Sequence, residues 1–141
     1  MPPNILTPAA ALVVWTLVMF LWMAATRGPA LKKLGTDELK PGARGSDLEP
    51  LLDERVNWKA HNYAHLHEQP TVFYAAVLIL ALAGYTTADV LLAWAYVALR
   101  VIHSVWQATI NRQPGRVVLF LLSSAFLIGL GARALVATLG G

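Results

Sequence analysis

Cysteine is absent from this 141-residue chain, and charged residues are scarce, at only 13% of the total. Without cysteine the chain can form no disulfide, no zinc site built on thiolates and no thiol nucleophile. Soluble domains carry on average about a quarter charged residues, so the low charge content disfavours that class. The net charge is only +3, and the basic residues are interleaved with acidic ones. A nucleic-acid-binding protein needs a basic face, so we expect no nucleic-acid partner.

Long apolar segments dominate the rest of the sequence, in which 57% of residues are hydrophobic. Residues 5–26 contain no charge, and about 20 apolar residues suffice for a helix to cross a bilayer. A cleaved signal peptide would have a basic start and a shorter apolar segment, so we predict a retained membrane helix. Further helices are expected at about 58–84, 88–110 and 117–138. The predicted fold is an all-α, integral membrane four-helix bundle forming one domain over residues 1–141.

The basic residues predict the orientation of this bundle. Residues 27–59 carry seven of the eleven lysines and arginines, and the connection before the fourth helix adds two more. The connection between the second and third helices has none. Because loops rich in lysine and arginine remain in the cytoplasm, we expect a cytoplasmic loop at about 27–57. Both chain termini are then expected on the opposite side of the membrane, and lipids surround the apolar helices.

A polar stripe opens the second predicted helix, in the stretch HNYAHLHEQP at residues 61–70. His61, His65 and Glu68 are spaced so that they share one helix face, with Asn62 close by. Pro70 removes a backbone hydrogen bond, which predicts a local bend and a freed carbonyl group. Two histidines and one carboxylate at this spacing are also a ligand set for zinc or iron. A metal site is therefore one hypothesis for the stripe.

A second polar stripe lies in the third predicted helix and consists of Arg100, His103 and Gln107. A charge inside a membrane span is costly and should face protein, so we expect Arg100 to pair with Glu68. One interpretation is an ion pair that only fixes helix packing. However, the two stripes hold more polar groups than one ion pair needs, which favours a polar pocket that opens to the cytoplasm and holds a charged ligand.

At these stripes the sequence resembles the membrane-associated proteins in eicosanoid and glutathione metabolism, the MAPEG family. The resemblance is strongest in NYAHLHEQPTVFYA and AWAYVALRVIHSVWQATINRQPGR, and closest to the bacterial branch. It implies a homotrimer in the bacterial inner membrane, with glutathione bound between subunits near the cytoplasmic side. It also implies a transferase or peroxidase that acts on a lipophilic small molecule.

The resemblance also assigns roles to single residues. Glu68 matches the glutamate that binds the glutathione amine, and Arg116 matches the arginine linked to thiolate activation. His65 stands in place of an asparagine, and Val117 and Phe120 supply no hydroxyl group. The expected substrate-binding residues are His61, Asn62, His65, Glu68, Arg100, His103 and Gln107, and the expected catalytic residue is Arg116. An alternative is a non-catalytic protein of the same fold that binds lipid or quinone or serves as a structural subunit of a larger complex.

Overall fold

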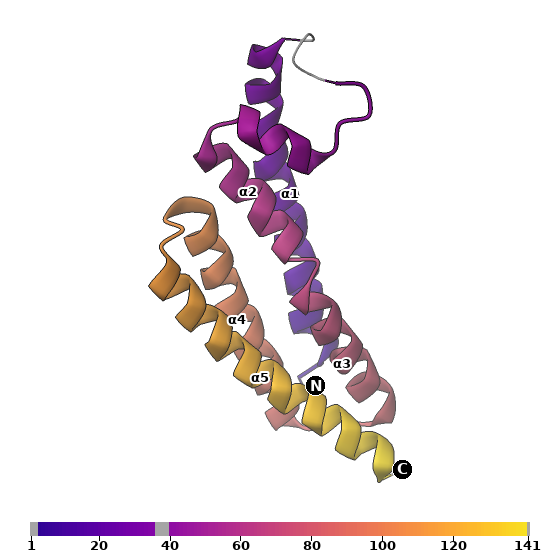
Figure 1. The fold of residues 1–141 in the computed structure, drawn as a ribbon. Coiled ribbons are helices and arrows are strands. Elements are labelled where there is room, and N and C mark those ends of the chain that lie inside the picture. Colours follow the sequence, from indigo (N-terminus) through magenta and orange to yellow (C-terminus); the bar gives the residue numbers. More distant parts are fainter. Residues whose placement is uncertain (1–2, 36–39, 141) are drawn as a thin grey trace.

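The computed structural model describes residues 3–35 and 40–140, which are helical and contain no strand (Figure 1). The helices are α1 (Leu6–Leu34), the short 3₁₀ helix η1 (Gly45–Leu51), α2 (Glu54–His65), α3 (Gln69–Ala83), α4 (Thr87–Thr109) and α5 (Gln113–Leu139). In these residues, α1, α2 with α3, α4, and α5 give four segments long and apolar enough to cross a membrane. The all-α membrane bundle predicted from the sequence is therefore confirmed.

Figure 1 shows how the helices are arranged. The α2 and α3 helices follow α1 along its length, and α4 and α5 form an antiparallel pair beside them. The labelled ends of the chain lie at the same end of the bundle, opposite η1 and the turn between α4 and α5. The two connections rich in basic residues are therefore on one side, as the positive-inside rule requires.

The α4 helix forms the centre of the bundle and contacts α1, α2 and α5. Its buried residues recur every three or four positions, from Val90 through Ala93 and Val97 to Arg100, which is the spacing of one helix face. The outer faces of α1 and α5 instead expose large apolar side chains, including Leu21 and Ile128. Such faces are stable in lipid, where the surrounding acyl chains are equally apolar.

Three helix boundaries differ by four or more residues from those expected from the sequence, and one of them is the start of α2, which lies at Glu54 rather than at residue 58. The α1 helix continues to Leu34, although we expected a loop from residue 27. Lys32 and Lys33 lie in its last turn, where cations interact favourably with the helix dipole, and Gly35 ends it with a φ of 76°. The α5 helix begins at Gln113 rather than residue 117, because Pro114 suits the first turn of a helix.

An ion pair joins α4 and α5 at the end of the bundle opposite η1. Asp89 is fully buried and caps α4 by accepting hydrogen bonds from the amide and hydroxyl of Thr86, both at 2.8 Å. Arg133 donates to the same carboxylate at 2.8 and 3.2 Å. The charge of Arg133, which interrupts the apolar sequence of α5, is therefore neutralised by a neighbouring helix.

Candidate functional site

The second membrane segment is broken at its polar stripe. The α2 helix ends at His65 and α3 begins at Gln69, with Pro70 in its first turn. Proline has no N–H to continue the hydrogen bonding of α2, and its fixed φ suits the start of a helix. The sequence predicted a bend with a freed carbonyl, and the structure shows a complete interruption over three residues.

Arg100 of α4 occupies the space beside this break. Its Nη2 donates to the His65 carbonyl at 3.0 Å, and the Glu68 N–H contacts the same oxygen at 3.4 Å, so the buried guanidinium supplies the shorter hydrogen bond at the break. The Arg100 side chain is fully buried, yet its Nε and Nη1 have no hydrogen-bond partner in the described residues. The Phe120 ring lies 5.9 Å from the guanidinium carbon. A buried charge with unused donors is costly, and an anion brought close to it would lower that cost.

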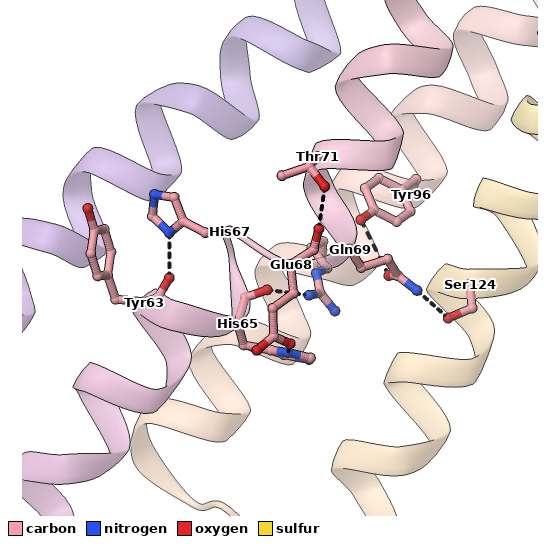
Figure 2. A network of polar contacts seen from close by, with 9 residues as sticks. Tyr63, His65, His67, Glu68, Gln69, Thr71, Tyr96 and Ser124 are labelled. Carbon is pink, nitrogen blue, oxygen red and sulfur yellow. Dashed lines mark hydrogen bonds and ion pairs between the residues drawn. The ribbon is translucent and has the colours of Figure 1, made fainter. Parts of the chain in front are cut away.

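The expected ion pair between Arg100 and Glu68 does not form. Among the described residues, the Glu68 carboxylate instead lies 2.6 Å from Nδ1 of His65 (Figure 2). The reason is the break, because Glu68 has a φ of −88° and a ψ of −95° and no longer continues the α2 helix. The Glu68 side chain is 66% exposed, whereas the Arg100 side chain points into the protein.

A cavity of about 190 Å³ collects side chains from three helices. It is lined by His65 of α2, His103 of α4, and Arg116, Val117 and Phe120 of α5. The His65 ring stacks on Phe120 with centroids 5.7 Å apart, and it lies 5.3 Å from the His103 ring. The cavity therefore combines two imidazoles and a guanidinium with an apolar wall. We call it the histidine–arginine pocket.

The turn between α4 and α5 positions Arg116 in this pocket. Arg116 Nη1 donates to Asn111 Oδ1 at 2.9 Å, and Asn111 has a left-handed φ of 51°. Trp106 Nε1 donates to the Arg112 carbonyl at 3.1 Å. The Trp106 ring lies so close to Gly115 that a Cβ there would be 2.6 Å from it. The position of Arg116 therefore depends on a tightly packed turn.

The family of the chain follows from a comparison with known proteins, in which residues 5–136 match the family model described as the MAPEG family. The chain belongs to the MAPEG family. The match covers nearly the full chain and includes every helix that contributes to the pocket. Comparisons with curated proteins and with solved structures found no match. The protein is therefore an integral membrane protein of the family associated with glutathione and eicosanoid metabolism.

Of the eight residues predicted for a MAPEG ligand site, only His65, His103 and Arg116 line the histidine–arginine pocket. Glu68 and Arg100 lie outside its lining but contact His65, and the other three make different contacts. His61 Nε2 lies 3.0 Å from the Glu49 carboxylate of η1. Asn62 is buried and donates to Ser104 at 2.8 Å, which fixes α2 on α4. Gln107 is buried as well, and its Oε1 has no hydrogen-bond partner in the described residues. The structure thus brings together His65, Glu68, Arg100, His103 and Arg116 and separates His61, Asn62 and Gln107 from them.

The metal hypothesis fails on the same geometry. In residues 3–35 and 40–140, no three side chains of the metal-ligating types gather within reach of one ion. His61 pairs with Glu49, whereas His65 pairs with Glu68, so the three residues proposed as ligands are divided between two contacts. His65 and Glu68 remain in contact across the break, whereas His61 is turned towards η1 instead of towards them.

Sequence reasoning missed two residues that support the pocket. Gln69 donates to Ser124 of α5 at 2.7 Å and accepts from the Tyr96 hydroxyl of α4 at 3.4 Å, as Figure 2 shows. It therefore ties the start of α3 to both neighbouring helices. Asn111, which holds Arg116, was read only as part of a connection. The position of Asn111 directly after a helix could have indicated its role, because asparagine tolerates the left-handed conformation that often ends a helix.

Proposed function

We propose that this MAPEG protein is a glutathione-dependent membrane transferase that conjugates lipophilic electrophiles. The observation that carries the proposal is the histidine–arginine pocket, in which Arg116 and two histidines lie beside the buried Arg100. A site that concentrates cationic and hydrogen-bonding groups between membrane helices suits an anionic ligand. Glutathione has two carboxylates, one amine and a thiol that reacts as the thiolate.

The residues present fit this ligand. Arg100 Nε and Nη1 are buried donors without partners in the described residues, so a glutathione carboxylate would satisfy them. Glu68 uses only Oε2 in its contact with His65 and keeps Oε1 for the glutathione amine. His103 adds a further hydrogen-bonding group to the pocket wall. One carboxylate and the amine of the tripeptide thus each have a partner of opposite charge.

Arg116 supplies the chemistry in this proposal. A free thiol has a pKa of about 8.5, and a nearby guanidinium lowers it because the positive charge stabilises the thiolate. Each unit by which the pKa falls corresponds to about 1.4 kcal/mol of preferential stabilisation of the thiolate. The thiolate then attacks the electrophilic carbon, and a carbon–sulfur bond forms as the leaving group departs. The lipophilic substrate arrives through the bilayer, which the apolar faces of the helices contact.

A single subunit offers only part of such a site. The pocket measures about 190 Å³, whereas pockets for small-molecule ligands usually have about 300–1,000 Å³. We infer that a neighbouring copy completes it and that the protein assembles as a homotrimer. Arg116, in the first turn of α5, lines the pocket, and Figure 1 shows the turn between α4 and α5 towards the end of the bundle that carries η1. We therefore place the pocket near the cytoplasmic face of the bacterial inner membrane, with both termini on the opposite side.

The experiment that tests the function is titration of the detergent-solubilised protein with glutathione. We expect saturable binding and an ultraviolet difference signal from thiolate at neutral pH. Arg116→Ala should remove the thiolate signal, and Arg112→Ala, a change to an exposed arginine of the same turn, should retain it. If the unmodified protein shows no saturable binding up to millimolar glutathione, the transferase function is wrong.

That negative result would favour the second candidate function, a non-catalytic protein that binds lipid or quinone. A separate groove supports it, with a volume of about 300 Å³ between α3 and α5 and an almost wholly apolar lining that includes Ala76, Ile79 and Ala134. Such a groove suits an acyl or isoprenoid chain. Co-purified lipid or quinone, identified by mass spectrometry and displaced by Ala76→Trp, would support this function.

A further inference from the structure

The contact between His65 and Glu68 has the geometry of a catalytic acid–base pair. Nδ1 of His65 and Oε2 of Glu68 are 2.6 Å apart. The His65 side chain is 25% exposed and lines the histidine–arginine pocket, whereas Glu68 is largely exposed. A carboxylate only accepts hydrogen bonds, so Nδ1 must carry the proton. The opposite nitrogen, Nε2, is then left with a free lone pair that can accept a proton.

The surroundings hold the imidazole in place. Its ring stacks on Phe120 with an interplanar angle of 30° and lies beside His103. Arg100 donates to the backbone carbonyl of His65 itself, which fixes the residue at the end of α2. A proton acceptor is effective when neighbouring groups set its tautomer and its orientation. Both conditions are met at His65.

The other residues of the pocket are poorer proton acceptors. Val117 and Phe120 have no ionisable group, and Arg116 remains protonated. His103 lines the same cavity, but among the described residues no carboxylate contacts it. His65 is therefore the one pocket residue in the described part of the chain whose imidazole is oriented by an acid.

We propose that His65 accepts the proton of the glutathione thiol and that Glu68 orients it for this step, an inference that rests on the function proposed above. The S–H bond breaks, its electron pair stays on sulfur, and the proton moves to Nε2 of His65. The resulting imidazolium is stabilised by the Glu68 carboxylate, and the thiolate by Arg116. When the thiolate adds to an α,β-unsaturated carbonyl compound, the imidazolium returns the proton to the enolate. The cycle then closes without any other reactant.

His67 provides a matched control for this role. It lies two residues after His65, within the interruption between α2 and α3, and its Nδ1 also makes a short contact, 2.8 Å to the carbonyl of Tyr63. Its ring packs edge-on against Tyr63 and does not line the pocket. Figure 2 shows the rings of His65 and His67 well apart. A change at His67 therefore alters a histidine of the same segment without removing the proposed proton acceptor.

The test measures the rate at which thiolate forms, by stopped-flow absorbance after the solubilised protein is mixed with glutathione. General acid–base catalysis typically contributes about 10²–10⁴-fold, so His65→Ala should slow thiolate formation about 100-fold or more while glutathione still binds. Imidazole added to the buffer should restore part of the rate. His67→Gln should match the unmodified protein, and Glu68→Gln should show a smaller loss that imidazole does not restore.

A pH profile provides the second measurement, with an α,β-unsaturated aldehyde as substrate. In His65→Ala the thiol must lose its proton to solvent, so the acidic limb of kcat/KM should move to higher pH. If His65→Ala binds glutathione, forms thiolate at the unmodified rate and keeps the same profile, the proposed pair is wrong and the transferase function stands. If the unmodified protein binds no glutathione, both proposals fall.

Discussion

Gly115→Ala is expected to disturb the candidate site from outside the pocket. Gly115 lies in the first turn of α5, directly before Arg116. A Cβ at this position would lie 2.6 Å from Cζ2 and 2.7 Å from Cε2 of Trp106. These separations are far below van der Waals contact, so the indole ring has to move or the start of α5 has to shift.

Gly115→Ala costs free energy of folding through two contacts of Trp106. Inserting a methyl group into a packed region costs about 1–3 kcal/mol. Displacing Trp106 also breaks the hydrogen bond from its Nε1 to the Arg112 carbonyl, which is worth about 0.5–1.5 kcal/mol. We therefore expect Gly115→Ala to destabilise the protein by about 1.5–4.5 kcal/mol. The shift should also move Arg116 relative to Asn111 and weaken the thiolate signal.

The assay is thermal unfolding of the detergent-solubilised protein, together with the glutathione titration. Gly129→Ala is the matched control, because its added Cβ would meet only Leu92 Cδ1 at 3.8 Å. That change should be neutral or should stabilise the protein by about 0.4–1 kcal/mol, because alanine leaves the unfolded chain less conformational freedom than glycine does. In the Trp106→Ala background, Gly115→Ala should cost little, since the clashing ring is gone. Equal melting temperatures for Gly115→Ala and Gly129→Ala would refute the packing proposed for this turn.

Three further predictions concern charges elsewhere in the bundle. Arg100→Met should abolish glutathione binding, measured by calorimetry, and lower the melting temperature only modestly, because the lost hydrogen bond to the His65 carbonyl is offset by removal of a costly buried charge; glutathione binding that survives the change would contradict the role of Arg100 in the ligand site. Asp89→Ala should lower the melting temperature more than Arg133→Ala, because Asp89 also caps α4; equal effects would contradict the capping role. Gly45→Cys, the single thiol in a chain without cysteine, should react with an impermeant maleimide only from the cytoplasmic side; labelling from the opposite side alone would reverse the proposed orientation.

Hydrophobicity alone predicted the four membrane segments, because a bilayer demands about 20 apolar residues for each helix. The end of α1 was not predictable in this way. Residues 27–34 are polar enough to be read as a loop, yet they continue the helix to Leu34. Their helical state depends on the interaction of Lys32 and Lys33 with the helix dipole and on the end of the helix at Gly35. Hydrophobicity measures neither effect.

The candidate site was predicted in part. His65, His103 and Arg116 share one pocket. This was predictable because the face on which each side chain lies follows from the spacing of residues within its own helix. The pairing of Glu68 with Arg100 was wrong, because it assumed that Glu68 continues a regular helix. The stripe from His61 to Glu68 was right only in part, since His65 contacts Glu68 but His61 contacts Glu49 of η1. Proline signalled that the helix would deviate, but the direction in which Glu68 then turns depends on its neighbours.

The break in the second membrane segment contributes to the candidate site. Pro70 interrupts the second membrane segment, and at the break the His65 carbonyl keeps only a long contact, 3.4 Å, with the N–H of Glu68. A poorly satisfied carbonyl is costly in a membrane, and Arg100 supplies a shorter hydrogen bond at 3.0 Å with one of its five N–H donors. Two nitrogens of the same guanidinium are left buried and unpaired in the described residues. The guanidinium that hydrogen-bonds the backbone at the break is thereby also a group that favours an anion, in addition to Arg116, which lines the pocket.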